Sequence, residues 1–334
     1  MSEKAINSIM TTLLKQLPIA PAAKTGWPWT EESAPLPPTI PDGKPWPKIS
    51  IVTPSFNQGQ FIEETIRSVL LQNYPNLEYI IIDGGSTDNS VEIIKKYEPW
   101  LTYWVSEKDN GQPHAINKGL SHCSGEIFNW INSDDYLTSG ALRIIAENFA
   151  DCDLVAAAVM VFDGNSSTVI QPAGLSARNL IIGSKTVNFL QPGAWLRTDK
   201  LKQIGGLNET LQYCFDWLAF IRYLHEFQDV TYLPDKVANY RLHETSKTVS
   251  SSSKMRDDRI VMQALLLLDP TIADNYRYEL LAYLKKQLRL HNINSINSGP
   301  HGNMRKVAKI ISEIARDIIS YPYRFALGAV RRLL

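Results

Sequence analysis

The most regular feature of the sequence is an alternation of short apolar runs with segments of helical periodicity, beginning at Lys48. The apolar runs are too short for helices and rich in β-branched residues, so they predict strands. The predicted strands span residues 49–53, 77–82, 101–105 and 126–131, and the predicted helices span residues 61–71, 89–97, 112–122 and 141–149. Strands that alternate with helices in this way indicate parallel β-α-β units with right-handed crossovers.

Polar residues follow each of these predicted strands. They occupy residues 54–57, 83–86, 106–109 and 133–135. Because the carboxyl ends of parallel strands meet at one edge of an open sheet, where ligands bind, we expect these segments to form one binding site. The sequence has no Gly-x-Gly-x-x-Gly fingerprint and no Walker A loop, which excludes the standard dinucleotide and P-loop sites.

Two adjacent carboxylates, Asp134 and Asp135, stand at the end of the last of these strands. Mg²⁺ and Mn²⁺ take one or two protein carboxylates and leave their other positions to water and substrate phosphates. The pair is therefore a candidate metal site. The same residues can instead begin a turn and cap the next helix, and this stretch alone leaves both interpretations open.

Two other residues at strand ends are candidates for nucleotide contacts. Asp83 precedes Gly84-Gly85, where the backbone can approach a ligand, and its carboxylate can accept a hydrogen bond from a base or a ribose. Phe56 can stack on a nucleobase, although an aromatic residue beside a strand can equally belong to the core.

The second half of the chain mixes short strands with helices. Residues 154–162 and 168–171 flank a Gly-Asn turn and predict a hairpin. Residues 212–224 predict a mostly buried helix that carries Asp216. A carboxylate on such a helix either pairs with a cation, here Arg222, or acts as a general base.

A polar loop follows two further predicted strands, at residues 230–233 and 237–240. The loop carries Arg241, His243 and Lys247, whose side chains can all bind phosphate oxygens.

Composition narrows the functional classes. The 34 Lys and Arg residues balance the 34 Asp and Glu residues, so no global field attracts nucleic acid, and we expect no nucleic-acid partner. Cys123, Cys152 and Cys214 have no metal-binding spacing and their odd number argues against a disulfide framework, which favours a reducing compartment. The longest uncharged apolar run, residues 154–162, is half the length that a membrane-spanning helix needs. We therefore expect a cytoplasmic protein.

The two ends of the chain differ from its middle. Residues 1–47 predict a short amphipathic helix followed by a proline-rich arm that wraps the next domain, with Trp27, Trp29 and Trp46 as anchors. Residues 251–334 predict a helical extension. Its final part, residues 301–334, combines an excess of basic residues with an isoleucine stripe, which fits either packing, including a homodimer contact, or peripheral contact with the inner face of a membrane.

Several ordered motifs within residues 48–250 resemble those of the family 2 glycosyltransferases. They are residues 50–57 (Ser-Ile-Val-Thr-Pro-Ser-Phe-Asn), 66–72 (Ile-Arg-Ser-Val-Leu-Leu-Gln), 82–88 (Ile-Asp-Gly-Gly-Ser-Thr-Asp), 109–112, 115–119, 132–135, 191–193, 204–209 and 213–217. The resemblance implies an α/β chain with the GT-A fold. In that fold a Rossmann-like, mostly parallel sheet binds the nucleotide, here within residues 48–136, and a mixed β segment, here within residues 137–250, binds the acceptor.

The same resemblance implies an activity and a cofactor. It implies metal-dependent, inverting transfer of a sugar from a nucleotide-sugar, most naturally a UDP-sugar, to a hydroxyl of a saccharide or lipid-linked acceptor in cell-surface polysaccharide synthesis. The implied cofactor is Mn²⁺ or Mg²⁺.

Site residues follow from the resemblance position by position. It implies that Asp216 is the catalytic base, that Asp135 and His243 bind the metal, and that Arg241 and Lys247 bind the diphosphate. The implied nucleotide-binding residues are Pro54, Phe56, Asn57, Asp83, Asp109, Asn117, Lys118 and Asp134.

The chain departs from the family pattern at two positions. Asn132 stands where many relatives have Asp, and His114 replaces an acid, so a role for Asn132 and the sugar contacts near His114 are in doubt. Two other functions stay open. One is a sugar-nucleotide pyrophosphorylase, although its Gly-rich phosphate loop is missing, and the other is a catalytically silent scaffold that binds nucleotide or glycan.

Overall fold

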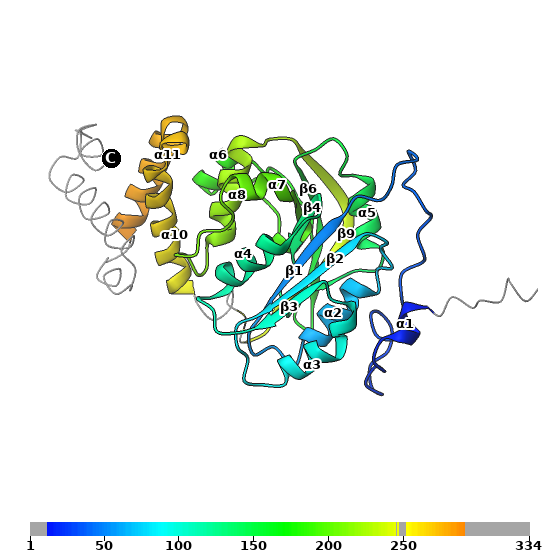
Figure 1. Cartoon of the computed structure of the whole chain (residues 1–334). Coiled ribbons are helices and arrows are strands. Elements are labelled where there is room, and N and C mark those ends of the chain that lie inside the picture. Colours follow the sequence, from blue (N-terminus) through cyan, green and yellow to red (C-terminus); the bar gives the residue numbers. More distant parts are fainter. Residues whose placement is uncertain (1–11, 245, 247–251, 291–334) are drawn as a thin grey trace, which may run out of the picture. The chain divides into compact units, whose positions relative to one another are not determined.

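The computed structural model describes residues 12–244, 246 and 252–290, which form parts of two compact units (Figure 1). The first, called the sheet unit, comprises Met1–Pro172, Phe189–Asp199 and Asp229–Arg241. The second, called the helical unit, comprises Ala173–Asn188, Lys200–Gln228 and Leu242–Leu334. The domain boundaries expected from the sequence stay a prediction, because these units follow contacts in space rather than blocks of sequence.

One nine-stranded sheet forms the sheet unit, in the order β3-β2-β1-β4-β8-β6-β9-β5, with β7 paired to β6. The strands are β1 (Ile49–Ser55), β2 (Leu77–Asp83), β3 (Tyr103–Ser106), β4 (Ile127–Trp130), β5 (Tyr136–Leu137), β6 (Leu154–Phe162), β7 (Ser167–Ile170), β8 (Ala194–Arg197) and β9 (Val230–Arg241). The first four strands of that order pair in parallel, as the alternating pattern predicts. The predicted α/β fold with a mostly parallel sheet is confirmed, and so is the hairpin of β6 and β7.

Helices cover both faces of the parallel half of the sheet (Figure 1). On one face lie α2 (Ile62–Leu70) and α3 (Ser90–Tyr97), followed by the short η2 (Glu98–Trp100), and on the other lies α4 (Gln112–His122). Another helix, α5 (Ala141–Glu147), packs against β9. Burial on both faces explains why the predicted strands are continuous apolar runs rather than alternating ones.

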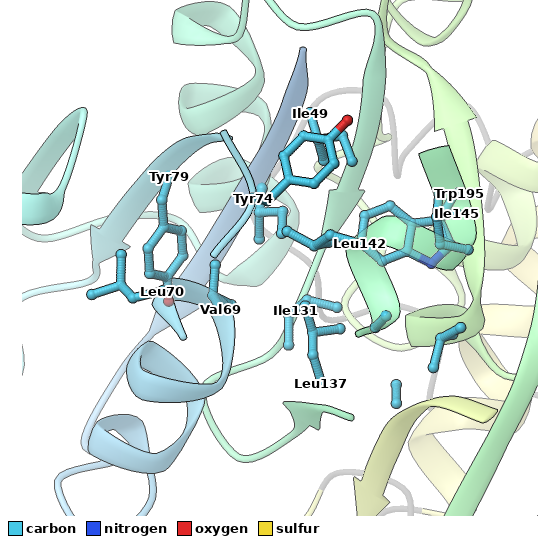
Figure 2. Packing of buried hydrophobic residues seen from close by; sticks show 14 of the residues in the cluster. Ile49, Val69, Leu70, Tyr74, Tyr79, Ile131, Leu137, Leu142, Ile145 and Trp195 are labelled. Atoms are coloured by element: carbon cyan, nitrogen blue, oxygen red, sulfur yellow. The ribbon is translucent and has the colours of Figure 1, made fainter. Parts of the chain in front are cut away.

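The main core lies on the face covered by α2, α3 and α5 (Figure 2). Ile49 and Tyr79 from the sheet pack there with Val69 from α2 and Leu142 from α5, and all four are buried. Burying side chains of this size contributes about 1.5–3 kcal/mol each, which holds the strand ends in register.

The second half of the sheet is mixed, as expected. β8 pairs antiparallel with β4 and β6, whereas β9 runs parallel to β6. The two strands predicted at residues 230–233 and 237–240 are one strand, β9, so that prediction is wrong. The register against β6 shifts after Leu233, where Pro234 lacks an N–H to donate, and the strand continues through this irregularity.

Tryptophans and a buried arginine hold the proline-rich arm against the sheet unit. Arg67 on α2 is 1% exposed and donates to the carbonyl oxygens of Pro18, Pro28 and Trp29. Trp29 and Trp46 are buried, and the Trp27 indole donates to the carbonyl oxygen of Leu137 at 2.7 Å. The expected packing of the arm by its tryptophans is confirmed.

The helical unit contains α6 (Ala177–Ile182), α8 (Phe215–Glu226), α10 (Ser252–Leu268) and α11 (Pro270–Leu290), while α1 (Leu13–Gln16), η3 (Gln191–Gly193) and α7 (Thr198–Gln203) complete the described helices. α8 begins three residues later than predicted. Three other expectations fall outside the described residues: the helix before Thr12, the role of Lys247, and the features of residues 301–334. In the part of the chain that is described, no helix is long and apolar enough to cross a membrane.

Candidate active site

The loops after β1 and β2 are joined at the carboxyl edge of the sheet. The Asn57 backbone N–H donates to Ser86 Oγ at 2.7 Å, and the Asn57 side-chain oxygen accepts from the Thr87 N–H at 2.8 Å. Asn57 itself has a φ of 52°, a left-handed conformation that asparagine tolerates better than most residues. The expected meeting of strand ends is therefore present for these two loops.

Asp83 organises the loop after β2. Its carboxylate is fully buried and accepts hydrogen bonds from Gly85 N, Ser86 N and Ser106 Oγ on Oδ2 and from Ser86 Oγ on Oδ1. Three of the four bonds end on one oxygen, so Oδ1 has the greater remaining capacity to accept a hydrogen bond.

The loop after β3 packs closely on the loop after β2. A Cβ atom at Gly84 would lie 2.7 Å from Asp109 Oδ2, so any larger residue would have to displace this carboxylate. Asp109 also accepts a hydrogen bond from Gly111 N at 2.8 Å, at the start of α4. Asp109 is thus brought to the same edge as Asp83 and Asn57.

Phe56 and Pro54 differ in exposure although they are two residues apart. Pro54 is buried within β1, beyond the point where the pairing of β1 with β4 ends. Phe56 is 59% exposed, so the alternative that it is a core residue is excluded. An exposed aromatic ring at the ligand-binding edge of a sheet suits stacking on a base.

Asp135 is the most buried acid of the candidate metal pair, with 1% exposure. Its Oδ1 accepts from the Arg241 backbone N–H at 3.0 Å and its Oδ2 from the Asn132 side-chain amide at 3.2 Å. Thr65 on α2 donates to the Asp135 carbonyl oxygen at 2.6 Å. Asp134 beside it is half-buried, so the more accessible carboxylate of the pair belongs to Asp134.

The electrostatics of this turn favour a cation. Burial, and then the neighbouring charge of Asp134, raise the pKa of Asp135 well above its usual range, while hydrogen bonds from Arg241 and Asn132 act against that rise. Two adjacent carboxylates with little water around one of them are stabilised by a positive charge.

Asn132 connects this turn to α4. Its Oδ1 accepts from the Gln112 side-chain amide at 2.7 Å while its amide nitrogen donates to Asp135. An aspartate at this position would lack the donor and would add a third carboxylate. Sequence reasoning left the role of Asn132 open because the residue departs from the family pattern, and its contact with Gln112, 20 positions away, has no local signal.

Arg241 is enclosed at the end of β9. Its Nε donates to the Asp134 carbonyl oxygen at 3.0 Å, and its Nη2 pairs with Glu64 on α2 at 2.8 Å. Its guanidinium also lies over three aromatic rings, at 4.8 to 5.5 Å, which belong to Phe61, Tyr136 and Phe162. These contacts fix Arg241 beside the acidic turn. Sequence reasoning missed Glu64, whose position in the first turn of α2 gives no local sign of a partner 177 residues away.

Asn117 and Lys118 lie within α4, on the other face of the sheet from α2. Asn117 is half-buried, and the Lys118 ammonium forms an ion pair with Glu107 in the loop after β3. A Cβ at Gly119 would lie 2.5 Å from Val52 Cγ1, so the glycine of this motif allows α4 to approach β1 closely.

The remaining candidates belong to the helical unit. Asp216 is the second residue of α8, half-buried, and accepts from the Trp217 backbone N–H at 2.8 Å. Arg222 pairs with Asp269, with Nε and Oδ2 3.6 Å apart. The alternative prediction of a structural ion pair between Asp216 and Arg222 is therefore wrong. Positions six apart on a helix differ by about 120° around the axis, which explains why they do not meet. The backbone N–H of His243 donates to Ser246 Oγ at 3.3 Å.

A divalent metal fits the acidic turn. Among the described residues no three His, Cys, Asp or Glu side chains cluster as a complete cage. Mg²⁺ and Mn²⁺ need no such cage, since one or two carboxylates with substrate phosphates suffice. The carboxylate oxygens of Asp134 and Asp135 meet that requirement.

Residues 50–205 match the model of the family described as glycosyl transferase family 2. An uncharacterized glycosyltransferase of Mycobacterium tuberculosis is 36% identical over 119 residues, which is 35% of this chain and 41% of that protein. The poly(ribitol-phosphate) β-N-acetylglucosaminyltransferase TarS of Staphylococcus aureus is 24% identical over 237 residues, covering 68% of this chain and 41% of TarS. The chain thus spans about two fifths of the length of these curated relatives.

Solved structures share the fold. A crystal structure of residues 1–349 of S. aureus TarS with UDP-GlcNAc has a TM-score of 0.59 at 18% identity, covering 86% of this chain and 84% of that one. A structure of GalNAc-T7 with UDP, GalNAc and Mn²⁺ has a TM-score of 0.52 at 13% identity, covering 83% and 58% of the two chains. The expected GT-A fold is confirmed at this level.

Proposed function

Because residues 50–205 match the model of glycosyl transferase family 2, we propose that this chain transfers a sugar from a nucleotide-sugar to an acceptor hydroxyl. The single observation that carries the proposal is the grouping of candidate ligand-binding residues at the carboxyl edge of the sheet. There Phe56, Asp83 and Asp109 gather at the ends of three parallel strands, and the Asp134–Asp135 turn follows the fourth strand, β4.

The donor is a UDP-sugar in this proposal. Phe56 stacks on the base, Asp83 Oδ1 accepts a hydrogen bond from it, and Pro54, Asn57 and Asp109 shape the surrounding loops. Asn117 and Lys118 contribute from α4, Lys118 through its pairing with Glu107. Support for UDP comes from TarS, whose crystals hold UDP-GlcNAc and UDP.

A bound Mn²⁺ or Mg²⁺ would be held by Asp135 and His243, and the adjacent Asp134 carboxylate, which the resemblance assigns to the nucleotide, is a further candidate oxygen donor. When bound, such an ion offsets the charge that develops on the departing diphosphate. Asn132 and the Arg241 backbone N–H orient the Asp135 carboxylate. Arg241 and Lys247 add positive charge for the diphosphate, and the contact with Glu64 keeps the Arg241 side chain in place.

Asp216 is the general base of the proposed mechanism. Its carboxylate takes the proton of the acceptor hydroxyl as that oxygen forms a bond to the anomeric carbon. The bond between the anomeric carbon and the diphosphate oxygen breaks on the opposite side, so the configuration inverts and a nucleoside diphosphate leaves. In this proposal the base belongs to the helical unit, which also contains His243 and Lys247, and the other residues assigned to the donor belong to the sheet unit.

The acceptor is a saccharide or lipid-linked hydroxyl of the cell envelope in this proposal. TarS is described as acting on poly(ribitol phosphate). A Bacillus subtilis relative, 37% identical over 92 residues, covering 27% of this chain and 36% of its own, is described as a putative teichuronic acid glycosyltransferase. In this proposal an enzyme that assembles such polymers is cytoplasmic. Its basic residues 301–334 contact the membrane or, in the alternative, form a homodimer contact.

Two measurements test the proposal. Calorimetry should show that Mn²⁺ tightens UDP binding, and that Asp134→Ala or Asp135→Ala removes this effect while the fold persists. Magnetic resonance of the product should show an inverted anomeric centre. Binding of UDP-sugar without any release of nucleoside diphosphate would favour the silent scaffold, and nucleotide-sugar formation from a triphosphate would favour the pyrophosphorylase.

A further inference from the structure

The segment that leads into α8 is held by another helix of the helical unit, α10. Asp258 on α10 uses its Oδ2 to accept hydrogen bonds from the backbone N–H groups of Gln212 at 2.8 Å and Tyr213 at 2.6 Å. These residues directly precede Cys214, the N-cap of α8, which has no side-chain cap bond. Asp258 therefore accepts hydrogen bonds from backbone N–H groups that lie just before the first turn of α8.

Further contacts from α10 surround the same turn. The Cys214 thiol donates to the Met255 carbonyl oxygen at 3.5 Å, and the Arg259 guanidinium lies 4.9 Å from the centre of the Trp217 ring. Arg259 is in turn linked to Tyr283 of α11 at 3.5 Å. Residues on both sides of Asp216 are thus bound by consecutive turns of one helix.

The Asp258 carboxylate is half-buried, so its position beside the segment before α8 is stable only while the backbone donates hydrogen bonds to it. Burial raises the pKa of Asp258, and hydrogen bonds from the backbone of Tyr213, Gln212 and Cys214 act against that rise. Burial, and then the charge of Asp216, raise the pKa of the Cys214 thiol to about 12, so it stays a neutral donor. A buried carboxylate is tolerated when several donors satisfy it.

We propose that Asp258 is a positioning residue for Asp216, so that α10 of the C-terminal extension takes part in catalysis. The inference rests on the proposed function, because it needs Asp216 to be the base. A base must lie within hydrogen-bond reach of the proton it removes. Asp216 sits four residues after Gln212 and three after Tyr213, so the backbone that Asp258 holds sets where its carboxylate points.

A purely structural cap predicts a different outcome from a positioning residue. Loss of a cap lowers the free energy of unfolding but leaves the turnover of the folded molecules unchanged. Loss of positioning lowers kcat of the folded protein without weakening donor binding, and a misplacement of about 1 Å can lower the rate about 100-fold. The split between kcat and the donor KM therefore separates the two roles.

The experiment compares three variants of the full chain with the wild type, using release of nucleoside diphosphate from UDP-sugar. In Asp258→Ala, kcat should fall by about 10- to 100-fold while the donor KM stays within about twofold. In Asp258→Asn, most of kcat should return, because both hydrogen bonds end on one oxygen that an amide can reproduce. Asp274→Ala, which removes an exposed carboxylate from α11, is the matched control and should behave as wild type.

Each outcome decides the inference. Unchanged kcat in folded Asp258→Ala, or an equal loss in Asp258→Asn, overturns it while leaving the proposed function intact, provided that Asp216→Asn is inactive. Full activity of Asp216→Asn overturns both. Should Asp258→Ala fail to fold, Asp258→Glu replaces it, since it keeps the charge but displaces the acceptor by one methylene, and its kcat must fall while that of Asp258→Asn does not.

Discussion

Phe56 and Asp135 both lie at the carboxyl edge of the sheet, but they differ in how much of each side chain is exposed. Phe56 leaves the end of β1 with 59% of its surface exposed, whereas Asp135 is 1% exposed and is held by the Arg241 backbone and Asn132. A substitution at Phe56 therefore reports on ligand binding alone, while one at Asp135 also alters a buried hydrogen-bonded turn.

Replacement of Phe56 by alanine should weaken UDP binding without lowering stability. Loss of a base-stacking contact costs about 1–3 kcal/mol, so the Kd should rise by about 5- to 150-fold. Calorimetry measures the Kd and thermal melting measures stability. Tyr278→Ala, which removes an aromatic ring that is 83% exposed on α11, is the control. An unchanged Kd in Phe56→Ala would show that the exposed ring does not contact the base.

Glu78 holds together the opposite end of the sheet. It is 3% exposed, its Oε2 accepts from Ser50 Oγ at 2.5 Å and Ser124 N at 2.7 Å, and its Oε1 lies 2.7 Å from Lys48 Nζ. Burial alone acts to raise its pKa, but the bonds from Lys48, Ser50 and Ser124 outweigh that effect and lower the pKa to about 2. These groups tie β1 and β2 to the loop before β4, far along the strands from the proposed site.

Glu78→Gln should destabilise the protein in a pH-dependent way. Because the pKa is lowered in the folded state, the charge stabilises the fold above the unfolded pKa of about 4.3, by about 2–3 kcal/mol, and this is lost as pH falls toward about 2. Urea unfolding of both proteins between pH 7 and pH 2 measures the difference. A difference that stays constant across this range would contradict the assignment.

Residue identity alone located the strand-end groups, since Asp83, Asp109 and Asp134 each lie within four residues of the end of an apolar run. It could not locate Glu64, Gln112 or Asp258. Their partners are 177, 20 and 46 or 45 positions away, and no local period relates such residues. Their roles arise only when the sheet and the helices pack.

At the scale of elements, burial on two faces made the parallel strands easy to predict, whereas ends of elements were harder. The strand β9 continues through Pro234 because an irregular register absorbs a residue that cannot donate a hydrogen bond. α8 begins at Phe215 rather than near Gln212, and the backbone N–H groups of Gln212 and Tyr213 bind Asp258 of α10. Neither end is marked by the local pattern of apolar residues.

The packing of α4 on β1 depends on Gly119. Apolar carbon atoms pack at about 3.5–4 Å, so an alanine whose Cβ lies 2.5 Å from Val52 Cγ1 cannot fit without movement. Gly119→Ala should therefore lower the free energy of unfolding by about 1–3 kcal/mol, less the helix preference of alanine.

A double-mutant cycle isolates this contact. In a Val52→Ala background the same change should cost less or become stabilising, because the clashing methyl groups are gone. Ser121→Ala, on the exposed side of α4, is the control and should change stability by less than about 0.5 kcal/mol. Equal costs of Gly119→Ala in both backgrounds would show that the clash with Val52 is not what requires glycine.

On the scale of the whole molecule, the proposed chemistry is divided between the two units. The sheet unit carries Asp135 and most of the groups assigned to the donor, and the helical unit carries His243, Lys247 and Asp216 with the helix that holds the segment before Asp216. The order of motifs along the chain predicted the α/β fold and the family match of residues 50–205. It did not predict that α10, from the C-terminal extension, and α8 belong to one compact unit.

The most direct test of the account is the release of nucleoside diphosphate by purified wild type and Asp216→Asn, measured over a panel of UDP-sugars with Mn²⁺ and a saccharide acceptor. The account predicts that wild type consumes at least one donor, and that Asp216→Asn lowers its kcat by about 10²- to 10⁴-fold while donor affinity barely changes. Near-wild-type turnover by Asp216→Asn, or a wild type that binds UDP-sugar but consumes none of the panel, would contradict it.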